Sequence, residues 1–386
     1  MSVTVKKLYQ NGSFLYHMEQ IGGKSGMMNL VKWVHIIEDE DVSKFLHGNE
    51  LVFTAGILNH TEDWLLEFAK KLFAAGASAF VVNIGPYTER VPKEVVAFCN
   101  QVGLPLFTIP WETRMVDMTR DFCQRIINSE QTEGTIASSI KSIIFKTGDA
   151  DTHLLQLERY GYQRESRFCF ISLELSEEQD AQGTMNRQDF IYQAEQEARK
   201  LHELFLSFSY KEYLIFVLTD YMAEEIELFL ENFLDRMKKK NPKGVFTIGI
   251  GQNKTGIYDL DKNFKSAIAA MEMAGKRKEV CCYYDTLNLH KLLYAIEDKS
   301  VIRQHYRDTI LRLEQYDREN ETQLTALLKS YLFHNGSLQE VAQIHYLHRN
   351  TVTNQLKKVE KILGLNPFEL EDKVALIMAF YMKEML

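Results

Sequence analysis

The order of apolar and polar residues divides the chain into regions with different patterns. Up to about residue 110, short apolar runs alternate with amphipathic stretches. Buried strands are predicted at residues 51–54, 79–83 and 104–107, and helices at residues 64–75 and 92–101. Elements that alternate at this spacing predict an α/β domain built on a parallel sheet with right-handed crossovers. Ligands of such sheets bind beyond the C-terminal ends of the strands.

Between residues 111 and 146 the pattern becomes helical. One apolar stripe runs from Met115 to Ile127 and a second from Ile136 to Ile144, with a break expected near Gly134. Stripes this short are typical of a core helix in a flanking domain, and equally of a helical connector that pairs two subunits. The pattern leaves both interpretations open.

The middle region returns to strands and helices in a different order. Strands are predicted at residues 167–175, 204–209, 213–218, 245–250 and 280–283, and helices at residues 189–202, 223–240 and 261–274. This order predicts an α+β domain of the βαββαβ type, with a tight hairpin turn at residues 210–213. A helical stretch at residues 289–316 leads into an all-α C-terminal region.

Near the C-terminus, two short amphipathic helices are separated by a tight turn. Ser337 is placed to cap the first, whose apolar residues are Leu338, Val341, Ala342 and Ile344. The second carries Val352, Leu356, Val359, Ile362 and Leu363 at helical spacing. This arrangement predicts a helix-turn-helix, in which the second helix lies in the DNA major groove. Tyr346 stands where such turns usually have glycine.

The outward positions of the second helix favour DNA contact over a merely solvated face. Asn and Gln side chains can hydrogen-bond adenine, and Lys and Arg can neutralise phosphates. The predicted DNA-binding residues are Arg349, Asn350, Thr351, Thr353, Asn354, Gln355, Lys357, Lys358 and Lys361.

Composition limits the possible functions. The 386 residues predict two or three domains, and the net charge of -8 argues against a protein coated in nucleic acid, although basic residues dominate the second helix. The five cysteines form no metal-binding spacing, and no catalytic motif is found, so no metal or cofactor is expected. No segment has the length of a membrane span, which predicts a soluble cytoplasmic protein without a membrane partner.

The chain resembles the PucR-type transcription regulators, the purine-catabolism regulator family, over nearly its whole length. The helix-turn-helix resemblance is carried by residues 348–352, 356–360, 363–365 and 372–376. The N-terminal region looks like the family's sensory domain through residues 31–35, 48–56, 75–77, 91–92, 103–106 and 109–110. The middle region is similar to a degenerate nucleotide-cyclase-like (GGDEF-like) domain through residues 247–251 and 284–285.

This resemblance implies four regions. They are a ligand-sensing domain at residues 1–110, a helical connector at 111–150 with dimerisation as one of its two interpretations, a GGDEF-like domain at 151–292, and a helical linker with the helix-turn-helix at 293–386. It also implies a ligand-responsive regulator of metabolic genes, such as those of purine or nitrogen-compound catabolism. The implied partners are double-stranded DNA, a small-molecule effector and a second copy of the chain, or more copies.

Six residues of the N-terminal region are candidates for the effector site. They are Trp33, His35, Glu50, Thr54, Asn83 and Tyr87. An indole can stack on a planar ligand, and carboxylate and amide groups can fix its polar atoms. Each residue also has a structural interpretation: Trp33 as a core residue, His35 as a hydrogen-bonded histidine and Glu50 as a cap.

Two departures from the family pattern bear on function. Thr353, Asn354 and Gln355 stand where the family commonly has Arg-Tyr-Arg, which predicts weaker nonspecific binding and a different operator. Residues 210–213 replace the glycine-rich turn of active cyclases, and Glu174 is a lone candidate metal carboxylate, which argues against catalysis. Two alternatives remain: a cyclase or phosphodiesterase with a helical tail, and a metabolite-binding adaptor that no longer binds DNA.

Overall fold

A computed structural model describes residues 3–386 except 59–62, 176–186, 241 and 243–244. By its internal contacts the chain forms two compact units. The first comprises Met1–Phe246 and Gly251–Ser266, and the second comprises Thr247–Ile250 and Ala267–Leu386. Among the described residues, none of the helices combines the length and the apolar character needed to cross a membrane.

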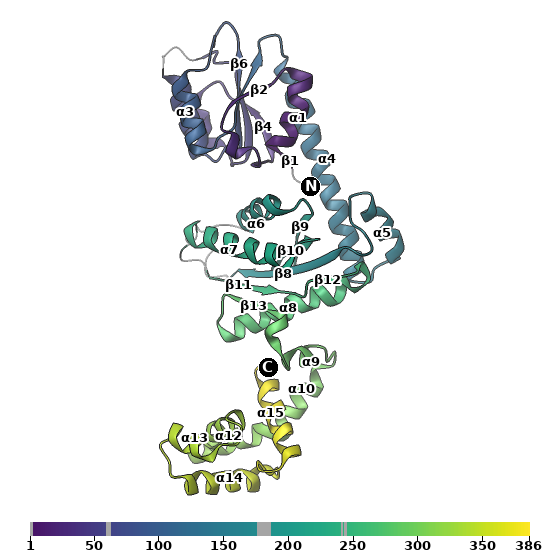
Figure 1. Ribbon diagram of the computed structural model, residues 1–386, viewed down its shortest axis with the longest axis vertical. Coiled ribbons are helices and arrows are strands. Elements are labelled where there is room, and N and C mark those ends of the chain that lie inside the picture. The colour runs from purple at the N-terminus through teal and green to yellow at the C-terminus, as the bar shows by residue number, and fades with distance from the viewer. Residues whose placement is uncertain (1–2, 59–62, 176–186, 241, 243–244) are drawn as a thin grey trace. The chain divides into compact units, whose positions relative to one another are not determined.

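The N-terminal domain is built on a five-stranded sheet of order β2-β7-β6-β5-β4 (Figure 1). Its strands are β2 (Glu19–Gly22), β4 (Trp33–Ile36), β5 (Glu50–Thr54), β6 (Ala79–Ile84) and β7 (Leu106–Pro110). Strands β4 to β7 are parallel, and β2 is antiparallel to β7. The predicted α/β fold with a parallel sheet is thus confirmed. Among the described residues, the parallel strands follow chain order without reversal and show no switch point of the kind at which many α/β sheets bind ligands.

The two faces of this sheet are covered by different helices, because alternate strand residues point in opposite directions. Leu51 and Phe53 pack in a core with α1 (Val5–Tyr16) and α4 (Met115–Ile144), whereas Val52 packs with α2 (Trp64–Ala74). Helix α3 (Lys93–Val102) completes the second face and ends at Gly103, whose φ of 72° suits a helix end.

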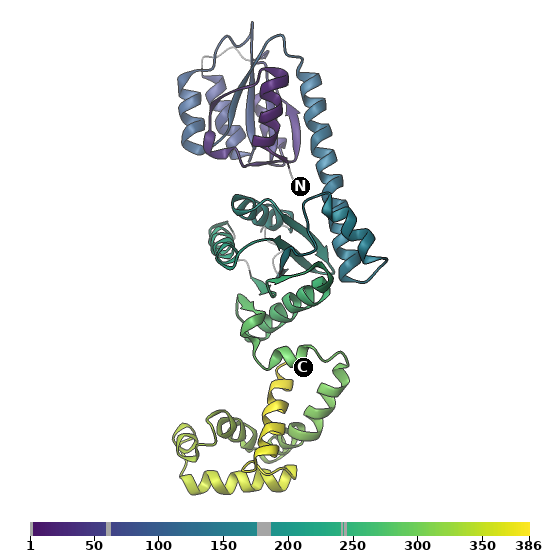
Figure 2. The ribbon, with the colours of Figure 1, turned by 45° about the vertical axis from the view of Figure 1, so that its right-hand side comes forward.

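Helix α4 is the main correction to the predicted elements. It runs unbroken from Met115 to Ile144, whereas a break was expected near Gly134 (Figures 1 and 2). A Cβ added at Gly134 would meet nothing within 4 Å, so this glycine serves neither a turn nor a close approach. The C-terminal half of α4 packs against α5 (Ala150–Glu158).

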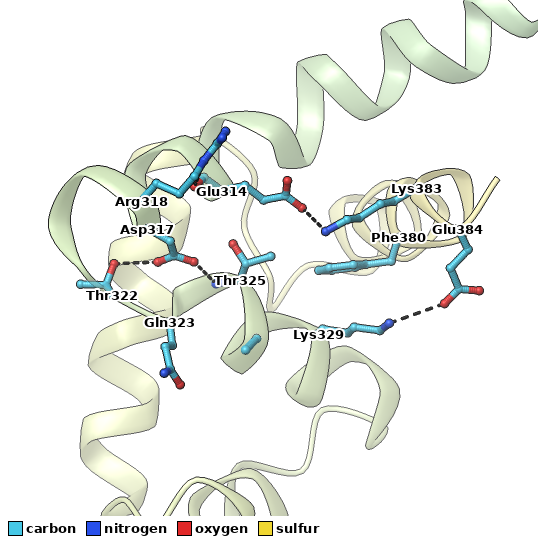
Figure 3. A pocket seen from close by; sticks show the side chains of 11 residues that line it. Glu314, Asp317, Arg318, Thr322, Gln323, Thr325, Lys329, Phe380, Lys383 and Glu384 are labelled. Atoms are coloured by element: carbon cyan, nitrogen blue, oxygen red, sulfur yellow. Dashed lines mark hydrogen bonds and ion pairs between the residues drawn. The ribbon is translucent and has the colours of Figure 1, made fainter. Parts of the chain in front are cut away.

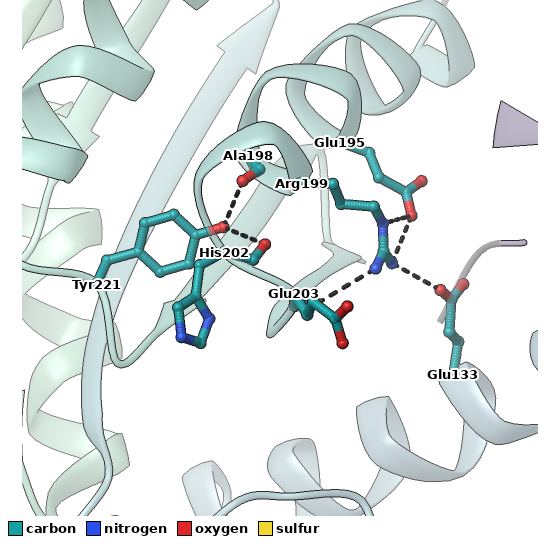
Figure 4. Close-up of polar contacts among 7 residues, drawn as sticks. All are labelled: Glu133, Glu195, Ala198, Arg199, His202, Glu203 and Tyr221. Carbon is teal, nitrogen blue, oxygen red and sulfur yellow. Dashed lines mark hydrogen bonds and ion pairs between the residues drawn. The ribbon is translucent and has the colours of Figure 1, made fainter. Parts of the chain in front are cut away.

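Buried Arg199 ties α4 to the middle domain (Figure 4). It extends from α6 (Arg187–Leu201), where its guanidinium lies 2.6 Å from Glu195 and 3.1 Å from Glu133 of α4. Its Nη1 also donates to the carbonyl oxygen of Glu203 at 3.2 Å. Removing one member of such a buried network costs roughly 3–5 kcal/mol, because the remaining charge is left without a partner.

The rest of the middle domain follows the predicted order. In the first unit, β10 (Tyr213–Thr219) pairs antiparallel with β8 (Arg167–Leu175) and with β9 (Phe205–Tyr210). The short β12 (Lys254–Thr255) runs beside β8, and α7 spans Ala223–Lys240. Strand β11 (Phe246–Ile250) pairs in parallel with β13 (Cys281–Tyr283), and α8 covers Leu260–Arg277.

The C-terminal region is all α, as predicted. Its helices are α9 (His290–Tyr294), α10 (Lys299–Tyr306), α11 (Arg312–Asn320), α12 (Leu324–Phe333), α13 (Leu338–Ile344), α14 (Arg349–Leu363) and α15 (Leu370–Lys383), with a π-helical turn at Arg307–Leu311. Residues from α11 to α15 share one apolar core.

The continuity of α4 predicts the effect of replacing its glycine. Gly134→Ala is expected to stabilise the helix by about 0.5–1 kcal/mol, because alanine restricts the unfolded backbone and fits the free space. Hydrogen exchange at residues 130–138, measured by mass spectrometry, is therefore expected to slow.

Gly256 provides the control for this substitution. It also has free space around it, but its φ of 106° is strained for any residue with a Cβ, so Gly256→Ala is expected to destabilise its loop. Unchanged or faster exchange in Gly134→Ala would contradict an unbroken α4.

Candidate functional site

The turn between α13 and α14 has the geometry of a helix-turn-helix. Ser337 caps α13 by accepting a hydrogen bond from the Glu340 amide, and Nδ1 of His348 caps α14 through the Asn350 amide. Tyr346 adopts a left-handed conformation with φ of 54° and is 96% exposed. This conformation costs a non-glycine residue about 1–2 kcal/mol, which explains why glycine is usual here.

The inward face of α14 fixes the direction of the helix. Val352, Leu356 and Val359 are fully buried and pack with Val341 and Ala342 of α13. Small Ala342 thus lies in the core shared by the two helices. Ile344, which was expected to share the apolar face of α13, is instead 48% exposed at the last residue of that helix.

The outward face of α14 carries most of the predicted DNA-binding residues. Exposed side chains are those of Arg349, Asn350, Thr351, Asn354, Lys357, Lys358 and Lys361. Thr353 and Gln355 are partly buried, and the Thr353 hydroxyl donates back to the carbonyl of Arg349 at 3.2 Å. Lys358 lies over the Tyr316 ring at 5.0 Å, which holds it at the flank. We call this outward set the α14 ridge.

A hollow of about 730 Å³ lies elsewhere in the C-terminal region, between α11, the start of α12 and α15 (Figure 3). Its charged side chains already have partners: Lys383 lies 2.6 Å from Glu314, and Lys329 lies 3.5 Å from Glu384. The carboxylate of Asp317 accepts from the Leu324 and Thr325 amides and so caps α12. These groups hold the helices together.

The six predicted effector residues fall into two groups at opposite ends of the sheet. Trp33 and Glu50 face each other in register at the start of β4 and β5, whereas Thr54 ends β5 and Asn83 lies next to the end of β6. Glu50 and Thr54 are four residues apart on one strand, or roughly 13 Å. One small ligand therefore does not touch both groups.

The strand-end group has its polar atoms engaged within the protein. The carboxylate of Glu38 accepts hydrogen bonds from the Thr54 hydroxyl and from the amides of Ala55, Gly56 and Ile57. The Asn83 amide donates to the carbonyl of Pro110 at 3.3 Å, although its buried Oδ1 has no recorded partner. The exposed Tyr87 packs on Trp111 at 5.8 Å. Glu38 thus already fills the one cluster of amide donors here.

The edge group borders a hollow of about 480 Å³ between β4 and α4, which we call the edge hollow. Trp33 and His35 line it together with Val34, Ile36, Val116, Thr119, Arg120 and Cys123. Trp33 is 49% exposed and so is not a core residue. Glu50 lies apart from this hollow: it is buried and accepts from the His47 amide, as its interpretation as a cap requires.

Sequence reasoning did not identify Arg120 and Glu38 as candidates. The signal for Arg120 was its helical spacing with Val116, Thr119 and Cys123, which places all four on one side of α4. The predicted apolar stripe of this helix, from Met115 to Ile127, included none of these four residues. Glu38 carried no comparable signal, because it lies between elements and its partners follow a different strand.

The hairpin turn of the middle domain is closed by aromatic packing. Lys211 has φ of 52°, and the Tyr210 ring stacks on Phe145 at 5.2 Å and meets Phe264 edge-on at 5.1 Å. Glu174 lies on β8 and is partly buried. Within the described part of the chain, acidic, histidine and cysteine side chains do not gather in threes as a metal site requires.

Three family models match successive parts of the chain. The model of the purine catabolism regulatory protein-like family matches residues 7–126, a GGDEF-like domain matches 147–273, and the PucR C-terminal helix-turn-helix domain matches 324–382. The expected resemblance and the order of its parts are thereby confirmed.

Individual relatives match over shorter stretches. The proline-responsive transcriptional activator PutR of Bacillus subtilis is 25% identical over 33% of this chain and 32% of its own. The purine catabolism regulatory protein of Bacillus subtilis is 27% identical over 29% of this chain and 22% of its own. The carbohydrate diacid regulator of Escherichia coli is 24% identical over 42% of each chain. The matches thus span well under half the length of these relatives.

Proposed function

Because the chain belongs to the PucR-type family of transcription regulators, we propose that it binds double-stranded DNA through the α14 ridge and that a small-molecule effector adjusts this binding. The observation that carries the proposal is the ridge itself. Arg349, Asn354 and Lys357 are exposed on the side opposite the buried Val352. Such a row offers positive charge to phosphates and amide groups to base edges.

The regulated genes are proposed to encode metabolic proteins, such as those that break down purines or other nitrogen compounds. The support is that relatives are a proline-responsive activator, a purine catabolism regulator and a carbohydrate diacid regulator. The effector is assigned to the N-terminal domain, and the protein is placed in the cytoplasm. Helix-turn-helix proteins commonly read two half-sites, so the active form is a homodimer or higher oligomer.

The middle domain is proposed to act in regulation and to have no cyclase activity. An active cyclase needs glycines at its hairpin turn so that backbone can approach the nucleotide phosphates. Here Tyr210 fills that turn, stacks on Phe145 and meets Phe264 edge-on. Purified protein incubated with GTP and manganese is therefore expected to form no cyclic nucleotide product by chromatography, and turnover at cyclase rates would contradict the assignment.

Two ridge substitutions test the DNA-binding proposal. Arg349→Ala and Lys357→Ala are each expected to weaken binding to a duplex selected from a random library by the wild-type protein. Each is also expected to make the negative slope of log affinity against log salt shallower by about 1, because one phosphate contact is lost. Thermal unfolding changes little, by about 0.5 kcal/mol or less, since both side chains are exposed.

Arg303→Ala is the matched control, because it removes the same charge from an exposed position on α10. It is expected to keep the wild-type salt slope. Failure of the wild-type chain to retain any duplex would instead favour the adaptor interpretation. Unfolding of the two ridge variants would show that their side chains are structural.

A further inference from the structure

Apart from the α14 ridge, groups that bind anions come together elsewhere among the described residues, and three such places are informative. At the strand ends, the amides of Ala55, Gly56 and Ile57 are already satisfied by the Glu38 carboxylate. In the hollow of the C-terminal region, Lys329 and Lys383 each pair with a glutamate. An anionic ligand at either place must displace a carboxylate of the protein, and the third place requires no such exchange.

The third place is the edge hollow, where Arg120 lies at one wall. Among the described residues, Arg120 has no recorded ion pair or hydrogen bond, whereas Arg125, one turn further on α4, pairs with Asp121 at 2.9 Å. Burial raises the pKa of the neighbouring Cys123 thiol, so the thiol stays neutral at neutral pH. The hollow therefore has an unneutralised guanidinium, a group that binds carboxylates with two parallel hydrogen bonds.

The other walls of the edge hollow are suited to an apolar body. Val34, Ile36 and Val116 line it, and Trp33 contributes a half-exposed indole. The hollow is wide open to solvent, and its volume of about 480 Å³ is sufficient for a small molecule. A ligand with an acid group and a compact apolar or ring-shaped body matches this combination.

We infer that the edge hollow is the effector site and that its ligand is a small carboxylic acid held by Arg120 and covered on one side by Trp33. This assignment rests on the proposed function, which requires an effector, and it specifies where and what that effector is. Of the six candidates from the sequence, it retains Trp33 and His35. The remaining four do not line this hollow.

The position of the hollow gives the ligand a route to the rest of the chain. A bound acid contacts β4 and α4 at once, so it favours one packing of this helix on the sheet. Because α4 has no break, its first turns and Glu133 belong to one rigid element. Glu133 is in turn held by Arg199 of the middle domain (Figure 4).

A thermal-shift screen with the full chain tests the assignment. It compares each small carboxylic acid with the corresponding uncharged amide. L-proline with L-prolinamide and galactarate with its diamide are included, and hits are measured by calorimetry. We expect acids to bind more tightly than amides. Arg120→Gln is expected to weaken acid binding at least ~10-fold, the loss of one charged hydrogen-bonded contact, and to remove the preference for acids.

Two further variants separate the contributions. Arg114→Gln removes an exposed charge at the start of the same helix and is expected to keep wild-type affinity. Trp33→Leu is expected to weaken acids and amides alike, because it removes the shared apolar wall. Wild-type affinity for acids in Arg120→Gln, or no acid bound by the wild type at millimolar concentration, would overturn the assignment. Duplex retention by the unliganded protein is measured separately, so a failed effector site is distinguishable from a failed DNA-binding proposal.

Discussion

The burial of one side of α14 is the constraint on which the functional account depends. Val352, Leu356 and Val359 lie at helical spacing and are fully enclosed by the C-terminal core. Each such side chain contributes about 1.5–3 kcal/mol by leaving water. Turning the helix over would expose all three side chains and bury several cations. The free-energy cost therefore keeps α14 in this orientation on the core. The α14 ridge is outward because its opposite side is apolar.

A second constraint is the continuity of α4, which connects the N-terminal sheet to the middle domain. Helix α4 packs on the five-stranded sheet at one end and contributes Glu133 to the Arg199 network at the other. A helix without a kink transmits a change of packing as a rigid element, whereas a broken one would absorb it. The hydrophobic residues Met118, Phe122 and Ile126 attach the first half of this helix to the sheet.

Most elements were predictable because the apolar pattern of each one matches its burial. Three of the four parallel strands of the N-terminal sheet, the middle hairpin and the helix-turn-helix follow from local periodicity, whereas the parallel edge strand β4 was not predicted. Helix α1 does not, because Asn11-Gly12-Ser13 is typical of a turn, yet a Cβ at Gly12 would lie 3.1 Å from Phe122. The glycine there allows α1 to approach α4, and that requirement is set by a residue far away in the sequence.

The candidate sites also differ in how far the sequence alone predicts them. The exposure of the α14 ridge was largely predictable, since a single helix determines which side chains share a face, although the predicted Thr353 and Gln355 are partly buried. The effector candidates were not, because their grouping depends on strand register: Trp33 and Glu50 are level with each other, while Thr54 lies at the opposite end of the sheet. Helical spacing groups Arg120 with Val116, Thr119 and Cys123 on one side of α4, but it does not show that this side meets β4.

Photo-crosslinking from the centre of the ridge measures the main claim most directly. The chain with benzoylphenylalanine at position 354 is irradiated with bound duplex DNA, beside the same chain labelled at position 303 on α10. The account predicts a covalent protein–DNA adduct from position 354 and none from position 303. Adducts from position 303 without any from position 354 would show that DNA binds a different surface.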